Sequence, residues 1–176
     1  MRLLMLKTVN ADMTAYNGFV WPREGYVRAN KWNPEPVCGD GLHGALYGCG
    51  DGSLFIWSPD AVWVVFEPIG EVVDLGGKAK CAEATVIYAG DRNTATDMIL
   101  NEFGPVACIG ATVTGGDGAT VTGGYGATVT GGARAALSIK WFDGNRHRIA
   151  TAYVGEDGIR PGVKYKCDCG KFVEVK

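Results

Sequence analysis

The sequence has little charge and no long apolar segment. Asp, Glu, Lys and Arg make up 20% of its 176 residues, and the formal net charge is −2. No segment approaches the roughly 20 apolar residues of a membrane-spanning helix, and a net charge so near zero gives no general attraction to nucleic acid. The apolar residues 1–10 are too short for a secretory signal peptide, and no small-residue cleavage site follows them. We therefore expect no membrane partner, disfavour nucleic acid as a partner, and expect a cytoplasmic protein.

The sequence also lacks the established motifs of catalysis and cofactor binding. It contains no P-loop, no dinucleotide-binding glycine fingerprint, no serine nucleophile elbow and no Cys-x-x-Cys pair. Its six cysteines are expected to be free thiols. Cys38, His43 and Cys49 share a glycine-rich segment and are candidates for a metal site, since thiolate and imidazole bind zinc; Cys38 and His43 could also form a nucleophile and its base. Because their spacing fits no standard motif, we predict no metal and no cofactor, and we favour a protein that is not an enzyme.

Three near-identical octapeptides begin at Gly110, Gly118 and Gly126, each reading Gly-Ala-Thr-Val-Thr-Gly-Gly with a variable last residue. The alternation of Ala-Thr-Val-Thr is typical of a β-strand, with Ala and Val on one side and both threonines on the other. The Gly-Gly pairs suit tight corners. The repeats predict a short β-solenoid in which two octapeptides make one two-sided coil. A three-stranded meander is the alternative.

The Thr-x-Thr pairs are similar to the flat threonine faces of ice-binding solenoids. Such faces need many regular rungs, whereas these repeats hold six threonines that could be divided over two sides. At this point the sequence favours ordinary solvated strand faces over an ice-binding face.

The remaining sequence predicts short strands and one helix. Asp91 or Thr94 can cap a helix over 91–103, which Gly104-Pro105 ends. The predicted strands are 2–9, 54–57 and 61–67, a possible hairpin of 71–75 with 81–88, a hairpin of 136–142 with 146–154, and 163–167 followed by 171–175. We predict a mostly β, α+β fold with an N-terminal α+β domain (1–104), an octapeptide β segment (105–133) and a C-terminal β-meander (134–176).

Candidate binding residues come from aromatic and basic segments. Trp21, Tyr26 and Trp32 lie in an irregular, proline-containing stretch and could form an exposed aromatic surface. Charge is unevenly distributed, with an excess of acidic residues in 1–133 and of basic residues in 134–176. Arg146 and Arg148 belong to the basic part, which could contact an acidic partner.

Three segments together resemble a family of uncharacterised phage and prophage accessory proteins. They are Lys7–Thr14, Cys38–His43 with the later Gly70–Val73, and the Ala/Thr/Gly repeats closed by Val154–Val175. The resemblance implies an origin in a mobile genetic element and a location in the host cytoplasm. It implies no reaction.

The leading hypothesis is a non-enzymatic phage accessory protein that counters a host defence system. Its expected partner is a host protein, which it binds, or a small ligand, which it sequesters. One alternative is an enzyme of the ADP-ribosyl-transferring kind, with His43 and Tyr47 in the site and Glu67 or Glu71 as the acid. Another is a virion component, because repeats of this kind can stack into homo-oligomers.

Overall fold

The structure, a computed structural model, describes residues 2–175. The chain forms two compact units, Met1–Gly104 and Pro105–Lys176. Strands make up 43% of the residues and helices 10%, which confirms the mostly β, α+β prediction. No helix of the described residues is long and apolar enough to cross a membrane.

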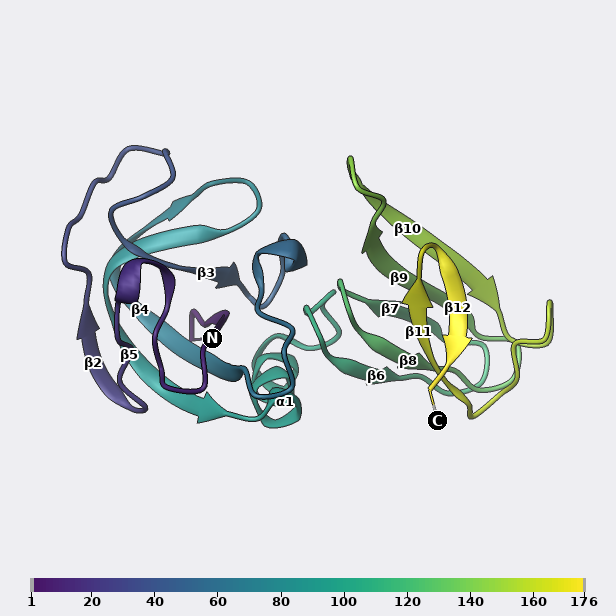
Figure 1. The fold of residues 1–176 in the computed structure, drawn as a ribbon. Helices are drawn as coiled ribbons and strands as arrows, with labels where there is room; N and C mark the ends of the chain where they lie inside the picture. The colour runs from purple at the N-terminus through teal and green to yellow at the C-terminus, as the bar shows by residue number, and fades with distance from the viewer. Residues whose placement is uncertain (1, 176) are drawn as a thin grey trace. The chain divides into compact units, whose positions relative to one another are not determined.

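The N-terminal unit is a sheet that closes on itself (Figure 1). β5 pairs with β3, β3 with β1, β1 with β4 and β4 again with β5, so these four strands form a ring. β2 pairs with the same edge of β5 as β3 does. The bounds of the strands are β1 (Met5–Val9), β2 (Gly25–Arg28), β3 (Leu42–Leu46), β4 (Val62–Asp74) and β5 (Ala79–Gly90).

The core of this unit lies inside the ring. It contains residues of all five strands together with Trp21, whose ring centre is 5.0 Å from that of Phe66. α1 (Arg92–Phe103) packs against β1, β4 and β5 and buries Ala95 and Ile99. The predicted helix is thus confirmed. Asp91 is its N-cap, and the Asp91 carboxylate accepts a hydrogen bond from Thr94 N at 2.9 Å.

The C-terminal unit contains two sheets that share one apolar core. One sheet has the order β10-β9-β7 and the other β12-β11-β8-β6. The core includes Val121 and Leu137 from the first sheet and Val129 and Tyr165 from the second. The strands are β6 (Thr112–Thr114), β7 (Thr120–Gly123), β8 (Thr128–Thr130), β9 (Ala136–Phe142), β10 (His147–Tyr153), β11 (Lys164–Asp168) and β12 (Lys171–Glu174).

The octapeptides pair in parallel. Thr112 lies opposite Thr128 in the β6–β8 pair, and Thr120 lies opposite Ala136 in the β7–β9 pair. An antiparallel three-stranded meander of the repeats is therefore wrong. The glycine that begins each octapeptide has φ of 72°, 67° or 67° at Gly110, Gly118 and Gly126, a conformation that a residue with a Cβ adopts only at a cost.

Several local predictions differ from the structure. Residues 54–57 form no strand. Leu54 ends the 3-10 helix η2 (Gly52–Leu54), and the residues after it cover Thr8, whose hydroxyl accepts a hydrogen bond from Ile56 N. The glycine-rich segment that holds Cys38, His43 and Cys49 contains β3. The C-terminal strands form two hairpins, β9–β10 and β11–β12, in different sheets rather than one meander, because β11 pairs with β8.

Candidate functional site

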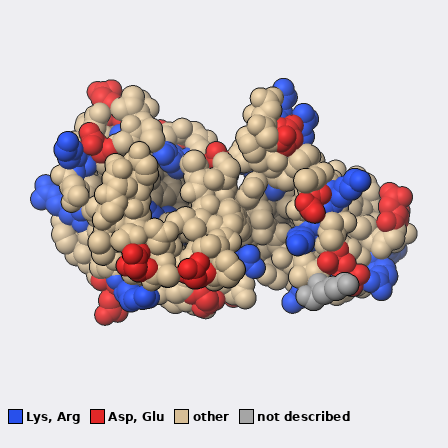
Figure 2. Space-filling model, in the orientation of Figure 1, with Lys and Arg blue, Asp and Glu red and all other residues tan. Residues whose placement is uncertain are grey.

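A pocket opens in the N-terminal unit where two strands of the ring separate. β1 and β3 pair only at Met5 with Leu46 and at Leu6 with Ala45, although β1 continues to Val9 and β3 begins at Leu42. The gap between them opens a cavity of about 850 Å³, which we call the β1–β3 pocket. Figure 2 shows a hollow in this unit with Lys or Arg atoms beside it.

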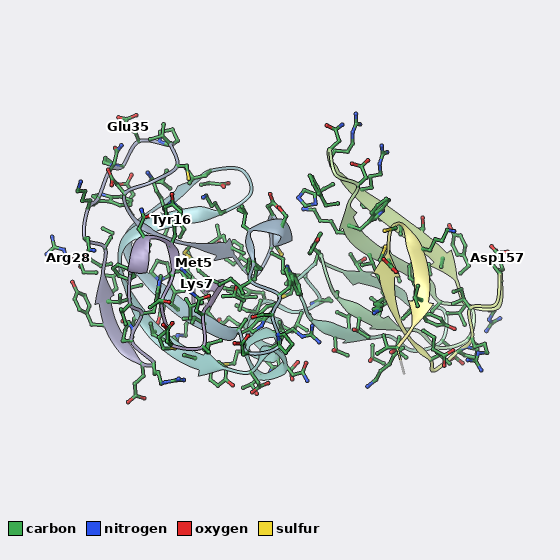
Figure 3. The ribbon with its side chains drawn as sticks, viewed as in Figure 1. Met5, Lys7, Tyr16, Arg28, Glu35 and Asp157 are labelled. Atoms are coloured by element: carbon green, nitrogen blue, oxygen red, sulfur yellow. The ribbon has the colours of Figure 1, made fainter. Side chains whose placement is uncertain are left out.

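Lys7 contributes an uncompensated positive charge to this pocket. The side chain lies inside the ring beside Met5 (Figure 3), and Nζ is 4.3 Å from the centre of the Trp21 ring. No hydrogen bond or ion pair joins Lys7 Nζ to any residue of the part of the chain that the structure describes. Burial, followed by the nearby Lys78 ammonium, lowers the pKa of Lys7 to about 7.

His43 lies on β3 at the other wall of the pocket. Its Nε2 is buried and has no hydrogen-bond partner among residues 2–175. Burial lowers the pKa of His43 to about 4, and the positive charges of Lys78, Lys7 and Lys80 act in the same direction. The imidazole is therefore neutral near pH 7, and the pocket combines a neutral imidazole with several ammonium groups.

Lys78 and Lys80 differ in their contacts. Lys78 Nζ donates to Cys38 Sγ at 3.0 Å and thereby lowers the pKa of the Cys38 thiol. Lys80 is fully buried and donates to the carbonyl oxygens of Val37 (2.7 Å) and Gly39 (3.3 Å).

The three aromatic residues predicted to form a binding surface lie in different environments. Trp21 is only 2% exposed and forms the inner wall of the pocket, because the segment before β2 folds back over the ring. Trp32 is half-buried, 5.7 Å from Lys80 Nζ, whereas Tyr26 is exposed on β2. Trp21 is therefore not part of an exposed aromatic surface.

The residues named for an enzymatic alternative do not gather around His43. Glu67 pairs with Arg2 at 2.7 Å, the Tyr47 ring packs on Phe103, and Glu71 is exposed on β4. None of Tyr47, Glu67 and Glu71 lines the β1–β3 pocket.

The candidate metal ligands do not come together. Across residues 2–175 no three His, Cys, Asp or Glu side chains are placed to hold a metal ion. Cys38 contacts Lys78, and Cys49 Sγ donates to Tyr47 O at 3.5 Å.

The candidate arginines lie in the C-terminal unit, at the turn between β9 and β10. Arg148 pairs with Asp143. The backbone N–H groups of Arg146 and Asn145, and then Arg148, lower the pKa of Asp143 to about 2. This carboxylate organises the turn.

A second candidate site is the outer surface of the β10-β9-β7 sheet. Thr122 lies opposite Ser138, and Ser138 lies opposite Thr151, so three hydroxyl side chains form a row across three strands. Ser138 Oγ is 3.2 Å from Thr122 Oγ1. We call this surface the hydroxyl face. Ser138 and Thr151 lie outside the octapeptides and are not among the predicted site residues. Their only signal in the sequence is the alternation of the strands that follow the repeats.

Comparison with known proteins identifies the family of the N-terminal part. The profile of a domain of unknown function, DUF7666, matches residues 3–100, which is more than half of the chain. The chain belongs to the DUF7666 family. No solved structure matches this DUF7666 protein.

Among characterised proteins, the DUF7666 chain is similar to ice nucleation proteins. It is 36% identical over 101 residues to the ice nucleation protein of Xanthomonas campestris pv. translucens, covering 56% of this chain and 6% of that protein. The corresponding protein of Pseudomonas fluorescens is 35% identical over 101 residues, covering 56% and 8%. InaU of Pantoea ananas is 30% identical over 103 residues, covering 57% and 10%. The chain thus spans a tenth or less of the length of these relatives.

These matches overturn the phage interpretation. The resemblance to phage and prophage accessory proteins is wrong, and so is the function drawn from it, the binding of a host factor to counter a defence system, because the similar proteins are bacterial ice nucleation proteins. The enzymatic and virion alternatives gain no support from these relatives. The predicted cytoplasmic location, which rests on the absence of a signal peptide and of a membrane segment and on the phage resemblance, is also contradicted by these matches.

Proposed function

We propose that the C-terminal unit is a short β-solenoid that takes part in ice nucleation by arranging water on its hydroxyl face. The similarity to proteins named for ice nucleation motivates this function. The observation that carries it is the row formed by Thr122, Ser138 and Thr151 on adjacent strands.

The backbone pairing supports a solenoid. Equivalent hydrogen bonds recur from one octapeptide to the next: Thr128 N donates to Ala111 O and Ala136 N donates to Ala119 O, both at 2.9 Å. Each donor lies in the coil that follows the coil of its acceptor. Stacking of this kind repeats the same side chain at the same position of each coil.

The hydroxyl face supports an arrangement of water. Strands in a sheet lie about 4.8 Å apart, and side chains on one face of a strand recur about every 6.7 Å. Thr120 and Thr122 are exposed on β7, and Thr151 is exposed on β10. The backbone ladder fixes these hydroxyls, so waters bound to them take up regular positions. Ordering each water costs no more than about 2 kcal/mol, and a hydrogen bond to the protein offsets this cost.

Droplet freezing and adsorption of the labelled chain to growing ice test this proposal. The key variant is Thr122→Lys, which places a flexible charge at the β7 end of the row of hydroxyls. Thr114→Lys is the matched control, because Thr114 has the same position in its octapeptide and is also exposed, but on β6 of the other sheet. We expect wild type and Thr114→Lys to adsorb to ice and raise the freezing temperature of droplets above that of buffer, and Thr122→Lys to lose both effects. Absence of both effects in the wild type, or equal losses in both variants, contradicts the proposal.

A further inference from the structure

The β1–β3 pocket is lined by a half-buried lysine, Lys7, that has no matching negative charge among residues 2–175. Within the described residues Lys7 Nζ makes no ion pair, and it lies over the face of Trp21. Two carboxylates line the pocket. Asp40 is an exposed residue of a loop. Asp51 accepts hydrogen bonds from Ser53 N (2.9 Å) and Ser53 Oγ (2.5 Å). Removing an ammonium even partly from water without a counter-charge is costly, so the presence of Lys7 in this cavity needs an explanation.

The imidazole of His43 adds a second unfilled interaction. Nε2 is buried without a hydrogen-bond partner within residues 2–175, although buried polar atoms are normally paired. In the neutral imidazole one nitrogen can carry a proton and donate. Lys7 and His43 lie on the two strands that separate to form the pocket, and Lys78 also lines it. An acidic ligand between the strands would accept hydrogen bonds from both walls.

Part of the pocket lining is apolar. Phe19, Trp21 and Phe55 contribute aromatic rings to its lining, and Leu54 and Ile56 contribute aliphatic groups. The cavity of about 850 Å³ is within the usual range for sites of small organic molecules. Its walls favour a planar apolar group beside the cationic end.

We propose that the β1–β3 pocket binds a small organic anion, in which a phosphate or carboxylate lies between Lys7, His43 and Lys78 and a flat apolar group packs on the aromatic wall around Trp21. The site is independent of the hydroxyl face and belongs to the DUF7666 part of the chain. The lowered pKa values of Lys7 and His43 support it, because both groups are destabilised as cations in the empty pocket and an anion would stabilise them.

Isothermal titration calorimetry of the full chain tests the site. The probes are phenyl phosphate, benzoate and inorganic phosphate, with phenol as the neutral analogue. We expect phenyl phosphate or benzoate to bind at least about tenfold more tightly than phenol, since a hydrogen bond to a charged partner is worth that factor or more. Whichever of phenyl phosphate and benzoate binds more tightly identifies the acidic group that the pocket prefers. The difference in affinity between phenyl phosphate and inorganic phosphate measures the contribution of the aromatic wall.

Variants separate the pocket from general charge effects. Lys7→Met is expected to weaken binding of the better anion about tenfold or more, whereas Lys171→Met, which removes an exposed lysine of β12 in the other unit, leaves it unchanged. If Lys7→Met does not fold, as judged by its thermal transition, Lys78→Met replaces it with the same expectation. Equal binding of anion and phenol, no binding of any probe, or an unchanged affinity in the Lys7 or Lys78 variant overturns the proposal.

Discussion

Thr128 lies directly beside Thr112 in the parallel pairing of β8 with β6, and both residues hold the same position in their octapeptides. The two strands therefore place equivalent residues of the octapeptides side by side. Val121 and Val129 are buried in the shared core, whereas Thr120 and Thr122 face solvent. The predicted alternation of the repeats is confirmed at these positions, but not at Thr130, which corresponds to Thr122 and is buried.

Charge substitutions test this pattern. Val121→Asp would bury a carboxylate among apolar side chains, so we expect it to lower the free energy of unfolding by about 3–5 kcal/mol. Thr120→Asp places the same charge in solvent and should change this energy by no more than about 0.5 kcal/mol. Urea titrations followed by circular dichroism measure both. Similar losses in the two variants would show that the faces are assigned wrongly.

Lys7 should make stability depend on pH above neutrality. Its pKa is about 7 in the folded state against 10.5 ordinarily. Below pH 7 the amine is protonated in both states and its burial cost is constant. Between pH 7 and 10.5 the unfolded chain keeps the proton that the folded chain has lost, so the free energy of unfolding rises with pH. We expect Lys7→Met to be more stable than wild type at pH 6 and this advantage to shrink toward pH 10. A constant difference between the two proteins across this range would contradict it.

His43 should make the free energy of unfolding depend on pH in the acid range. Its pKa is about 4 in the folded state against 6.5 ordinarily. As the pH falls from 6.5 to 4, the unfolded chain takes up a proton that the folded chain does not, so the free energy of unfolding falls. His43→Gln removes this contribution while leaving every carboxylate in place. Thermal transitions of the two proteins at pH 7, 5.5 and 4 should diverge as the pH falls; parallel curves would rule out the buried neutral imidazole.

Features encoded by a few adjacent residues could be predicted from the sequence. Asp91 caps α1 because its carboxylate reaches Thr94 N three residues later. The Asp143-Gly144 turn joins β9 to β10 for a similarly local reason, with Asp143 Oδ1 accepting from Asn145 N and Arg146 N. In both cases the residues that determine the structure lie within a few positions of one another.

The pocket could not be predicted in this way. The glycine-rich segment around His43 forms β3 only because it pairs with β1 on one edge and β5 on the other, and these contacts join residues far apart in the chain. The cavity then depends on where the β1–β3 pairing stops, which is Leu6 opposite Ala45. Trp21 likewise looks like a loop residue in the sequence, and its burial follows from packing on Phe66.

Gly44 shows how closely β3 approaches the core beside this pocket. A Cβ at Gly44 would lie 2.8 Å from two ring carbons of Phe66 and 3.1 Å from Leu6 O. Because Phe66 is fully buried, its ring has little room to move. We expect Gly44→Ala to lower the free energy of unfolding by about 1–3 kcal/mol through overpacking.

The control for this prediction is Gly116→Ala, where no atom lies within 4 Å of the added Cβ and φ is not positive. This variant should unfold within about 0.5 kcal/mol of wild type. Adding Phe66→Leu to Gly44→Ala gives the decisive measurement, since a smaller side chain at 66 relieves the contact while creating a cavity of its own. The double variant should then lose less stability than the sum of the two single losses, a coupling that residues in contact show and distant ones do not. Strict additivity in this cycle would mean that Gly44 and Phe66 do not touch, and that β3 approaches the Phe66 side chain less closely than the structure shows.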